Sequence, residues 1–370
     1  MWKSRFSSRL SPAPQEAEVG KVMSFAIGIV GATGVTGEVT LRVLQERSFP
    51  VGQLRLFASQ RSAGQRIRWK GRDHAVEALE DGRFDGLDVV ISATSASIAR
   101  EWAPRMVEAG AVVIDQSSAF RLDPAVPLVV PEINESDIET HAGIIAGPNC
   151  TTAVAVMAIA PLERAVGVDS VISSSYQATS GGGRDGMAEF LDLSRKAVDQ
   201  PEGLRGHEPL KLSTPRQFPQ VPAFNLFPHC EVFHEGSDVS TEEEKMEPEL
   251  RKILHAPALL VHATAVRVPV LVGHSVSLAL SLRREIAPAE ARELLSSFPG
   301  IRVLDQPWRG EYPTPLRAAG TDDILVGRVR SLPGLRNGLS LFACGDNLRK
   351  GNALNAVQVA ECVLGIDRRV

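Results

Sequence analysis

The stretch FAIGIVGATGVTG, residues 25–37, decides the fold of the chain. Its first six residues form an apolar run typical of a buried strand, and a helical pattern begins just after Gly34. Glycines let backbone amides approach a pyrophosphate, and the N-terminus of a helix favours an anion. The spacing GxxGxxG differs from the common GxGxxG, so the strand–turn–helix context carries the interpretation. We predict a dinucleotide-binding turn with Gly31, Thr33, Gly34 and Val35 at the cofactor.

Short apolar runs rich in β-formers alternate with helical segments on both sides of this turn. Such alternation indicates βαβ units around a parallel sheet, and hence an α/β fold. Strands are expected at residues 25–30, 54–58, 88–93, 111–116 and 143–147, and helices at 35–47 and 97–110.

The pattern changes after about residue 150. Long strands are expected at 168–179, 258–268 and 274–282, the last with period-two alternation that predicts an antiparallel strand with one face on a core. The stretch 201–229 contains six prolines and little periodicity, which indicates an irregular surface excursion. The segment 351–365 is again helical.

The composition is that of an ordinary globular protein of about two domains. Lys and Arg total 40 against 44 Asp and Glu among 370 residues, so the charge of −4 predicts neither a nucleic-acid nor a membrane-surface partner. The four cysteines form no CxxC pair, so neither a disulfide framework nor a metal site is expected, and a cytoplasmic location is the default. Apolar runs stay below the roughly 18–20 residues that span a bilayer.

Residues 1–23 are rich in Ser and Pro and have no apolar core, so they do not resemble a secretory signal. We expect a flexible N-terminal extension, or an upstream start codon with Met23 beginning the folded part. Glu16 and Glu18 speak against an organelle-targeting segment.

The second strand ends in ASQRSAGQ, residues 58–65, where an NAD-selective domain usually has an acidic residue. Ser59, Arg61 and Ser62 instead offer a cation and two hydroxyls, a set that suits a 2′-phosphate. The sequence therefore favours NADP over NAD. Taken alone, Arg61 would be a solvated surface arginine.

Cys150 lies in AGPNCTT, residues 146–152, at the start of an apolar helical run. A thiol at a helix N-terminus has its thiolate stabilised by the helix dipole and by free amides, so its pKa is expected to fall. Cys150 is therefore a candidate nucleophile. Taken alone, a cysteine beside an apolar helix is more often a small core residue.

Three polar residues elsewhere are candidate partners of this thiol. Gln177 is expected near a strand end before a Gly-rich turn, where its amide can orient a carbonyl. Arg267 and His274 flank a short Pro-containing connection; an arginine can clamp a carboxylate, and a histidine near neutrality can move protons. Each has a structural alternative: a capped turn, a surface charge and a satisfied core histidine.

The motifs together resemble those of the aspartate-semialdehyde dehydrogenases. GATGVTG, ASQRSAGQ, DQSSAFR, AGPNCTT, YQATSGGG, TEEEK, RVPVLVGHS and DNLRKGNALNAVQVAE follow that family's order, over about residues 24–365. The resemblance implies an N-terminal Rossmann-type NADP-binding domain, residues 24–149, completed by a C-terminal helix within 346–370. It implies an α+β catalytic and dimerisation domain with a mixed sheet over 150–345, and a homodimer.

The resemblance also implies roles for individual residues. Cys150 would be the nucleophile with Gln177 beside it, and His274 the acid/base. Arg267 would grip the substrate α-carboxylate and Glu242 the substrate amine, with Glu243 an open alternative in the run of three acids. The remaining implied contacts are phosphate at Arg121 and Lys245, with Ser118 assisting, and cofactor at Gly181, Asn347 and Lys350.

The chemistry implied is thioester formation on Cys150 from aspartate 4-semialdehyde, with hydride transfer to NADP, followed by attack of phosphate to give 4-phospho-L-aspartate. His274, with a pKa expected near 6.5, would take and return protons. The biosynthetic direction, towards lysine, methionine and threonine, is the reverse. Two alternatives remain: an N-acetyl-glutamyl-phosphate reductase, whose cysteine usually lies in a PGCY-like setting, and a non-catalytic nucleotide-binding paralogue.

Overall fold

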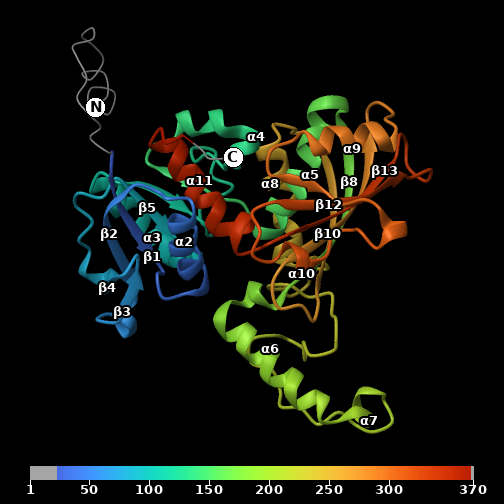
Figure 1. Cartoon of the computed structure of the whole chain (residues 1–370), viewed down its shortest axis with the longest axis horizontal. Coiled ribbons are helices and arrows are strands. Elements are labelled where there is room, and N and C mark those ends of the chain that lie inside the picture. Colours follow the sequence, from blue (N-terminus) through green and yellow to red (C-terminus); the bar gives the residue numbers. More distant parts are fainter. Residues whose placement is uncertain (1–22, 368–370) are drawn as a thin grey trace.

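The protein is represented by a computed structural model that describes residues 23–367. The extension expected at 1–23 therefore lies outside the described residues, apart from Met23. Two sheets stand next to each other, and a helical arm projects away from the second one (Figure 1). No helix in the described part of the chain has the length and apolar character needed to cross a membrane.

The first sheet has seven strands in the order β3-β4-β2-β1-β5-β6-β7. Its strands are parallel except for β3, which forms a hairpin with β4. The bounds are β1 Phe25–Val30, β2 Val51–Ala58, β3 Arg66–Trp69, β4 Arg72–Ala78, β5 Val89–Ser92, β6 Val112–Asp115 and β7 Ile144–Ala146. Helices α2 (Val35–Glu46) and α3 (Ala96–Glu108) connect them, and α4 (Pro131–Asn134) precedes β7. The parallel α/β sheet expected from the sequence is confirmed; the hairpin was not predicted.

The second sheet is mixed and has six strands in the order β11-β12-β13-β10-β8-β9. Its central strand β10 pairs antiparallel with both β8 and β13, whereas β8 and β9 are parallel. The bounds are β8 Val168–Gln177, β9 Leu260–Arg267, β10 His274–Leu282, β11 Ile301–Val303, β12 Ile324–Ser331 and β13 Leu339–Gly345. The antiparallel strand predicted at 274–282 is confirmed, and its buried face packs on the core.

Helix α5 (Cys150–Val166) is almost wholly buried and supplies much of the core of the second sheet. Helices α8 (Thr241–Ile253) and α9 (Pro288–Ser296) share that core. A π-helical turn, Arg349–Ala353, leads into α11 (Leu354–Val363), whose apolar residues pack in the core of the first sheet. The last helix therefore returns to the first sheet, and we propose the division of the chain at residues 149 and 345 on this basis.

The region after β8 departs most from expectation. The turn Thr179–Gly182 leads into α6 (Gly183–Val198) and the short α7 (Pro201–Leu204), the projecting arm in Figure 1. We did not predict α6 from the sequence, because it begins in a Gly-rich turn and buries few of its residues. Beyond α7 the Pro-rich stretch is irregular up to α8, apart from isolated bridges, as expected. The short α10 (Pro315–Ala318) precedes β12.

Candidate functional site

Glycines in the turn after β1 allow neighbouring backbone segments to approach each other closely. Gly31 has a φ of +82°, and a Cβ there would lie 2.3 Å from the carbonyl oxygen of Ala93. A Cβ at Gly37 would lie 2.5 Å from the Gly31 carbonyl oxygen, so this glycine lets α2 pack on the turn. The N-cap of α2 is Gly34, which has no side chain to occupy the first amides. The turn therefore fits an anion such as a dinucleotide pyrophosphate.

The end of β2 lies against this turn. The amides of Gly31 and Ala32 both donate to the carbonyl oxygen of Phe57. Ser59 stands at the N-cap position of a short 3₁₀ turn, Gln60–Ser62, directly after the strand, but its side chain makes no capping hydrogen bond; Arg61 in the turn is exposed. The residues expected at a 2′-phosphate thus follow the strand that adjoins the glycine turn.

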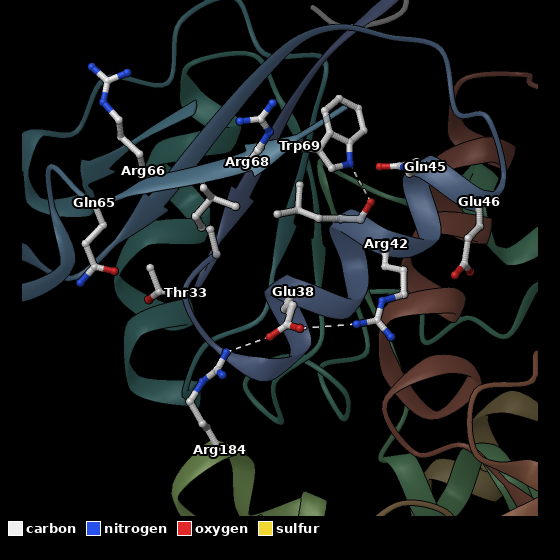
Figure 2. Close-up of a pocket in the computed structure, with 13 residues that line it drawn as sticks. Thr33, Glu38, Arg42, Gln45, Glu46, Gln65, Arg66, Arg68, Trp69 and Arg184 are labelled. Carbon is white, nitrogen blue, oxygen red and sulfur yellow. Dashed lines mark hydrogen bonds and ion pairs between the residues drawn. The ribbon is translucent and has the colours of Figure 1, made fainter. Parts of the chain in front are cut away.

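A cleft of about 700 Å³ lies beside this region but only partly coincides with it. It runs from Thr33 along α2 to β3, and its lining includes Arg66 and Arg68 (Figure 2). Arg184, at the start of α6, pairs with Glu38 of α2 across its lower end. Of the residues expected to bind cofactor, only Thr33 lines it.

Strand register places Gln177, Arg267 and His274 at the same end of three neighbouring strands of the second sheet. Gln177 ends β8 and is the register partner of Arg267, which ends β9. His274 begins β10, whose next residue pairs with Tyr176 in the antiparallel direction. All three side chains are buried, so residues up to 97 positions apart in the sequence form one buried polar cluster.

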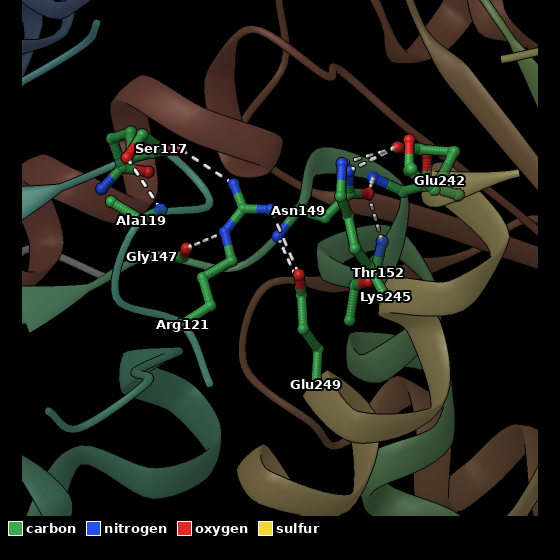
Figure 3. A network of polar contacts seen from close by, with 12 residues as sticks. Ser117, Ala119, Arg121, Gly147, Asn149, Thr152, Glu242, Lys245 and Glu249 are labelled. Carbon is green, nitrogen blue, oxygen red and sulfur yellow. Dashed lines mark hydrogen bonds and ion pairs between the residues drawn. The ribbon is translucent and has the colours of Figure 1, made fainter. Parts of the chain in front are cut away.

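Cys150 is the first residue of α5, as expected. The N-cap is Asn149, whose side-chain oxygen accepts hydrogen bonds from the amides of Thr151 at 2.8 Å and Thr152 at 3.3 Å (Figure 3). Gly351 of the π-helical turn lies against the cysteine, since a Cβ there would be 3.0 Å from the Cys150 Cβ. The thiol is half-buried between these two elements.

The expected fall in the pKa of Cys150 is wrong for the free protein. Burial raises the pKa of this thiol to about 12, and the negative charge of Glu242 adds to the rise. Arg121 and Arg267 act in the opposite direction but do not outweigh burial. The expectation counted the helix N-terminus and omitted the desolvation of the thiolate and the acid beside it.

Glu242 connects the elements around the thiol. Its carboxylate accepts hydrogen bonds from Asn149 Nδ2 at 2.9 Å, Thr151 Oγ1 at 3.1 Å and Gln177 Nε2 at 2.9 Å. Burial raises the pKa of Glu242, and the nearby negative charge of Glu231 raises it further. Glu242 therefore fixes the cap of α5 against the end of β8.

The neighbouring Glu243 has a structural role instead. Its side chain accepts from the amide of Ser240 at 2.8 Å, and its own amide donates to Ser240 Oγ, which completes a capping box at the start of α8. The other carboxylate oxygen accepts from the amide of Ala265. Of the two acids that the sequence left open, only Glu242 faces the pocket.

Arg121 is hydrogen-bonded to the backbone before α5 and to a glutamate of α8. Its guanidinium donates to the carbonyl oxygens of Gly147 and Gln116 at 2.9 and 2.8 Å, and to Glu249 at 3.1 Å (Figure 3). The second oxygen of Glu249 accepts from the amide of Asn149 at 2.7 Å. Three of the five N–H groups of Arg121 are thus engaged, which leaves two for a ligand.

Lys245 lies one turn after Glu242 on α8. Its ammonium is hydrogen-bonded to Glu231 and lies 3.9 Å from Glu242. Ser118, which was expected to assist at the phosphate, is exposed.

The expected pKa of His274, near 6.5, is also wrong. The ring is fully buried, and burial together with the charge of Arg267 lowers its pKa to about 3. Its Nδ1 accepts a hydrogen bond from the amide of Ala178 at 3.0 Å, so the neutral ring carries its proton on Nε2. That Nε2 has no hydrogen-bond partner among the described residues. His274 therefore presents a free N–H donor to the pocket.

Arg267 has a similar unsatisfied donor. Its Nη1 donates to the carbonyl oxygen of Ala178 at 2.6 Å, whereas its buried Nε has no partner in the described part of the chain. A Cβ at Gly181 would lie 3.1 Å from Arg267 Nη1 and 3.6 Å from His274 Nε2. The glycine at position 181 thus keeps the space between the two side chains open.

Asn347 and Lys350, the two residues expected near the nicotinamide, have different surroundings. Asn347 Oδ1 accepts from Ser180 Oγ and from the amide of Gly273, so it joins the turn before α6 to the start of β10. The Lys350 ammonium is fully buried and bonded to Glu132, Asn355 and Gln358. The side chain of Lys350 supports the core, so any contact with a cofactor would have to come from its backbone.

Three residues of this region were not singled out in the sequence: Asn149, Glu249 and Glu231. The signal for Asn149 was present, because asparagine before an apolar helical run is a common N-cap. Glu249 and Glu231 carry no local signal, since only the tertiary fold pairs them with Arg121 and Lys245.

Two domains of known protein families match the chain, one over the first sheet and one over the second. Residues 26–141 match the semialdehyde dehydrogenase NAD-binding domain, and residues 159–350 match the semialdehyde dehydrogenase dimerisation domain. An aspartate-semialdehyde dehydrogenase of Aquifex aeolicus is 42% identical over 345 residues, 92% of this chain and 98% of the relative. One of Mycolicibacterium smegmatis is 43% identical over 343 residues, 90% of this chain and 97% of the relative.

A solved structure agrees with these sequences. Aspartate semialdehyde dehydrogenase II of Vibrio cholerae, complexed with ASA, has a TM-score of 0.86 at 36% identity and covers 93% of this chain and 99% of its own. Both domain matches and full-length relatives therefore agree on one assignment. The chain belongs to the aspartate-semialdehyde dehydrogenase family.

Proposed function

We propose that the protein interconverts aspartate 4-semialdehyde and 4-phospho-L-aspartate with NADP as the hydride carrier. In the biosynthetic direction it would reduce the acyl phosphate on the way to lysine, methionine and threonine. The observation that carries this proposal is that Gln177, Arg267 and His274 lie together at one end of the second sheet, and that Glu242 joins Gln177 to the helix start that carries Cys150. The relative from Vibrio cholerae, which was solved with ASA, adds support.

The proposed chemistry begins when the Cys150 thiol loses its proton to solvent and its sulfur forms a bond to the aldehyde carbon. Negative charge then develops on the aldehyde oxygen, and the free Nε2–H of His274 is suited to donate a hydrogen bond to it. Gln177, fixed by Glu242, would orient the same carbonyl. This role for His274 needs a neutral ring, which agrees with its lowered pKa.

The proposed substrate contacts follow from charge. The unpartnered Nε of Arg267 suits the α-carboxylate, because a guanidinium binds a carboxylate through two parallel N–H groups. Glu242, the acid that faces the pocket, would hold the substrate amine. Arg121, with two N–H groups remaining, and Lys245 would hold phosphate, which attacks the thioester carbon and releases the sulfur of Cys150.

The proposed cofactor site is the turn after β1, with Gly31, Thr33, Gly34 and Val35 at the pyrophosphate. The uncapped start of α2 and the spaces kept by glycine support this assignment. Ser59, Arg61 and Ser62 would bind the 2′-phosphate of NADP. Gly181, Asn347 and the backbone at Lys350 are proposed at the nicotinamide end. When bound, NADP would take the hydride from the adduct and leave a thioester on Cys150.

We also propose a homodimer and a cytoplasmic location. The family model names a dimerisation domain. The sheet face opposite α5 carries the exposed Ile172 and the ring pair Tyr176–Phe342, which would suit a second copy. Cys150, Cys230 and Cys344 form no disulfide within the described part of the chain, as a reducing compartment allows.

The test is an assay of NADP reduction by purified protein. We expect absorbance at 340 nm to rise only when aspartate 4-semialdehyde and phosphate, or arsenate, are both present, and to rise more slowly with NAD. Faster turnover of N-acetylglutamate semialdehyde would assign the chain to the alternative reductase. Binding of NADP without turnover of either aldehyde would indicate a non-catalytic paralogue.

Replacing Arg267 with lysine should chiefly raise the KM for aspartate 4-semialdehyde, by about 10- to 100-fold. The arginine can hold the Ala178 carbonyl and the substrate carboxylate at once, whereas a lysine ammonium reaches only one of them well. Steady-state kinetics should show a smaller change in kcat and an unchanged KM for phosphate. A raised KM for phosphate alone would instead assign Arg267 to the phosphate.

A further inference from the structure

Glu231 holds the ammonium group that we assign to the phosphate. It lies in the irregular stretch before α8, and its carboxylate is hydrogen-bonded to Lys245 Nζ. The same carboxylate accepts from Thr241 Oγ1 at 2.9 Å. Its backbone has a φ of +61°, a left-handed conformation that disfavours residues other than glycine, asparagine and aspartate. The carboxylate of Glu231 therefore lies where an anionic ligand of Lys245 would bind.

The charges at this position leave no excess positive charge for a ligand. Lys245 faces two carboxylates, Glu231 in direct contact and Glu242 at 3.9 Å. Burial alone would raise the pKa of Glu231, but the hydrogen bond and charge of Lys245 outweigh it and lower that pKa. Glu231 is therefore ionised at neutral pH. A phosphate dianion that approaches Lys245 must replace this carboxylate or be repelled by it.

Of the two acids, only Glu231 is free to move. Glu242 is 6% exposed and accepts hydrogen bonds from three other residues, so its displacement would disrupt the cap of α5. The Glu231 side chain is 42% exposed. Its loop is anchored separately, by a hydrogen bond from the Thr241 amide to the Val232 carbonyl and by a bridge between Phe233 and Ser240. The side chain can turn towards solvent while the loop stays in place.

We propose that Glu231 occupies the anion position at Lys245 in the free enzyme and yields it to phosphate, so that its charge sets the affinity for phosphate. This inference rests on the proposed function, in which Lys245 binds phosphate. Glu231 is thus a positioning residue that acts through Lys245, and it does not take part in bond making or breaking.

The test is Glu231→Gln, which removes the charge while its amide oxygen can still accept from Thr241 Oγ1. The KM for phosphate, in the direction of NADP reduction, should fall about three- to tenfold. The kcat at saturating phosphate should stay unchanged, and the KM for the aldehyde should change less than the KM for phosphate, since loss of the Glu231 charge reaches the aldehyde site only through the pKa of Glu242. Glu235→Gln is the matched control: it removes the same charge from an exposed residue of the same loop and should leave all three constants unchanged. An unchanged or raised phosphate KM in Glu231→Gln would overturn the inference.

A second variant, Lys245→Met, allows this inference to be tested separately from the function on which it rests. Lys245→Met should raise the KM for phosphate, and Glu231→Gln added to it should lower that KM less than it does in the wild type, because only the direct repulsion of phosphate by Glu231 remains. An effect of Glu231→Gln that is equally large without Lys245 would contradict the route through the lysine. If Lys245→Met leaves the phosphate KM unchanged, the assignment of phosphate to Lys245 fails, whatever Glu231→Gln does.

Discussion

Cys150→Ser is expected to remove essentially all turnover, on the order of 10⁴-fold or more, while NADP still binds. A serine hydroxyl is a far weaker nucleophile than a thiolate and cannot form the thioester that phosphate attacks. The substitution is nearly isosteric, so the cap of α5 by Asn149 should persist. Initial rates and a fluorescence titration with NADP, on the same preparation, measure the two effects separately.

Cys362→Ser is the matched control, since that cysteine is also half-buried but lies on α11, outside the pocket. It should retain the wild-type rate. Turnover by Cys150→Ser close to that of wild type would contradict the nucleophile assignment. Loss of NADP binding together with turnover would indicate misfolding, which circular dichroism and thermal unfolding would detect.

The first half of the fold could be predicted because its determinants are local. The turn after β1 contains glycines at positions where a Cβ would collide with backbone, and apolar runs mark each parallel strand. Helix α6 could not be predicted in the same way: it starts with glycines, projects from the body and buries few of its residues. Its position depends on tertiary context that local patterns do not encode.

The sequence suggested Gln177, Arg267 and His274 as partners of the thiol, but it did not show how they come together. Gln177, Arg267 and His274 meet because β9 and β10 both pair with β8, and this strand order has no signature in the sequence. Glu242 and Glu243 could have been distinguished, since Ser240 and Glu243 have the S-x-x-E spacing of a capping box. The phosphate role of Arg121 stays a prediction, and its partner Glu249 is 128 residues away.

The pKa values were the property of the site that the sequence predicted least well. The expectation for Cys150 followed from one local feature, the helix N-terminus, whereas the pKa in the fold depends mainly on burial and on Glu242. The expectation for His274 assumed an unperturbed ring, whereas burial and Arg267 lower its pKa. Both errors have the same origin, because desolvation depends on the surrounding fold rather than on neighbours in sequence.

The lowered pKa of His274 predicts the pH dependence of the enzyme. With a pKa of about 3, the ring is protonated only in strong acid and stays neutral from pH 5 to 9. The profile of kcat/KM should therefore show no inflection near pH 6.5 from this residue, and should rise towards alkaline pH as the thiol of Cys150, whose pKa is raised to about 12, ionises. An acid limb near pH 6.5 that disappears in a His274 variant would contradict the neutral ring.

Replacing His274 with asparagine should lower kcat by about 10²- to 10³-fold with a smaller change in the KM for the aldehyde. Asparagine Oδ1 can take the place of Nδ1 and accept from the Ala178 amide, so the variant removes mainly the Nε2–H donor. His274→Gln is the informative comparison, because its amide N–H reaches further and can restore part of the lost donor. Since a general base requires a ring nitrogen that accepts a proton, rescue by glutamine would support hydrogen-bond donation to the developing oxyanion. Equal and complete loss in both variants would instead assign His274 to proton transfer.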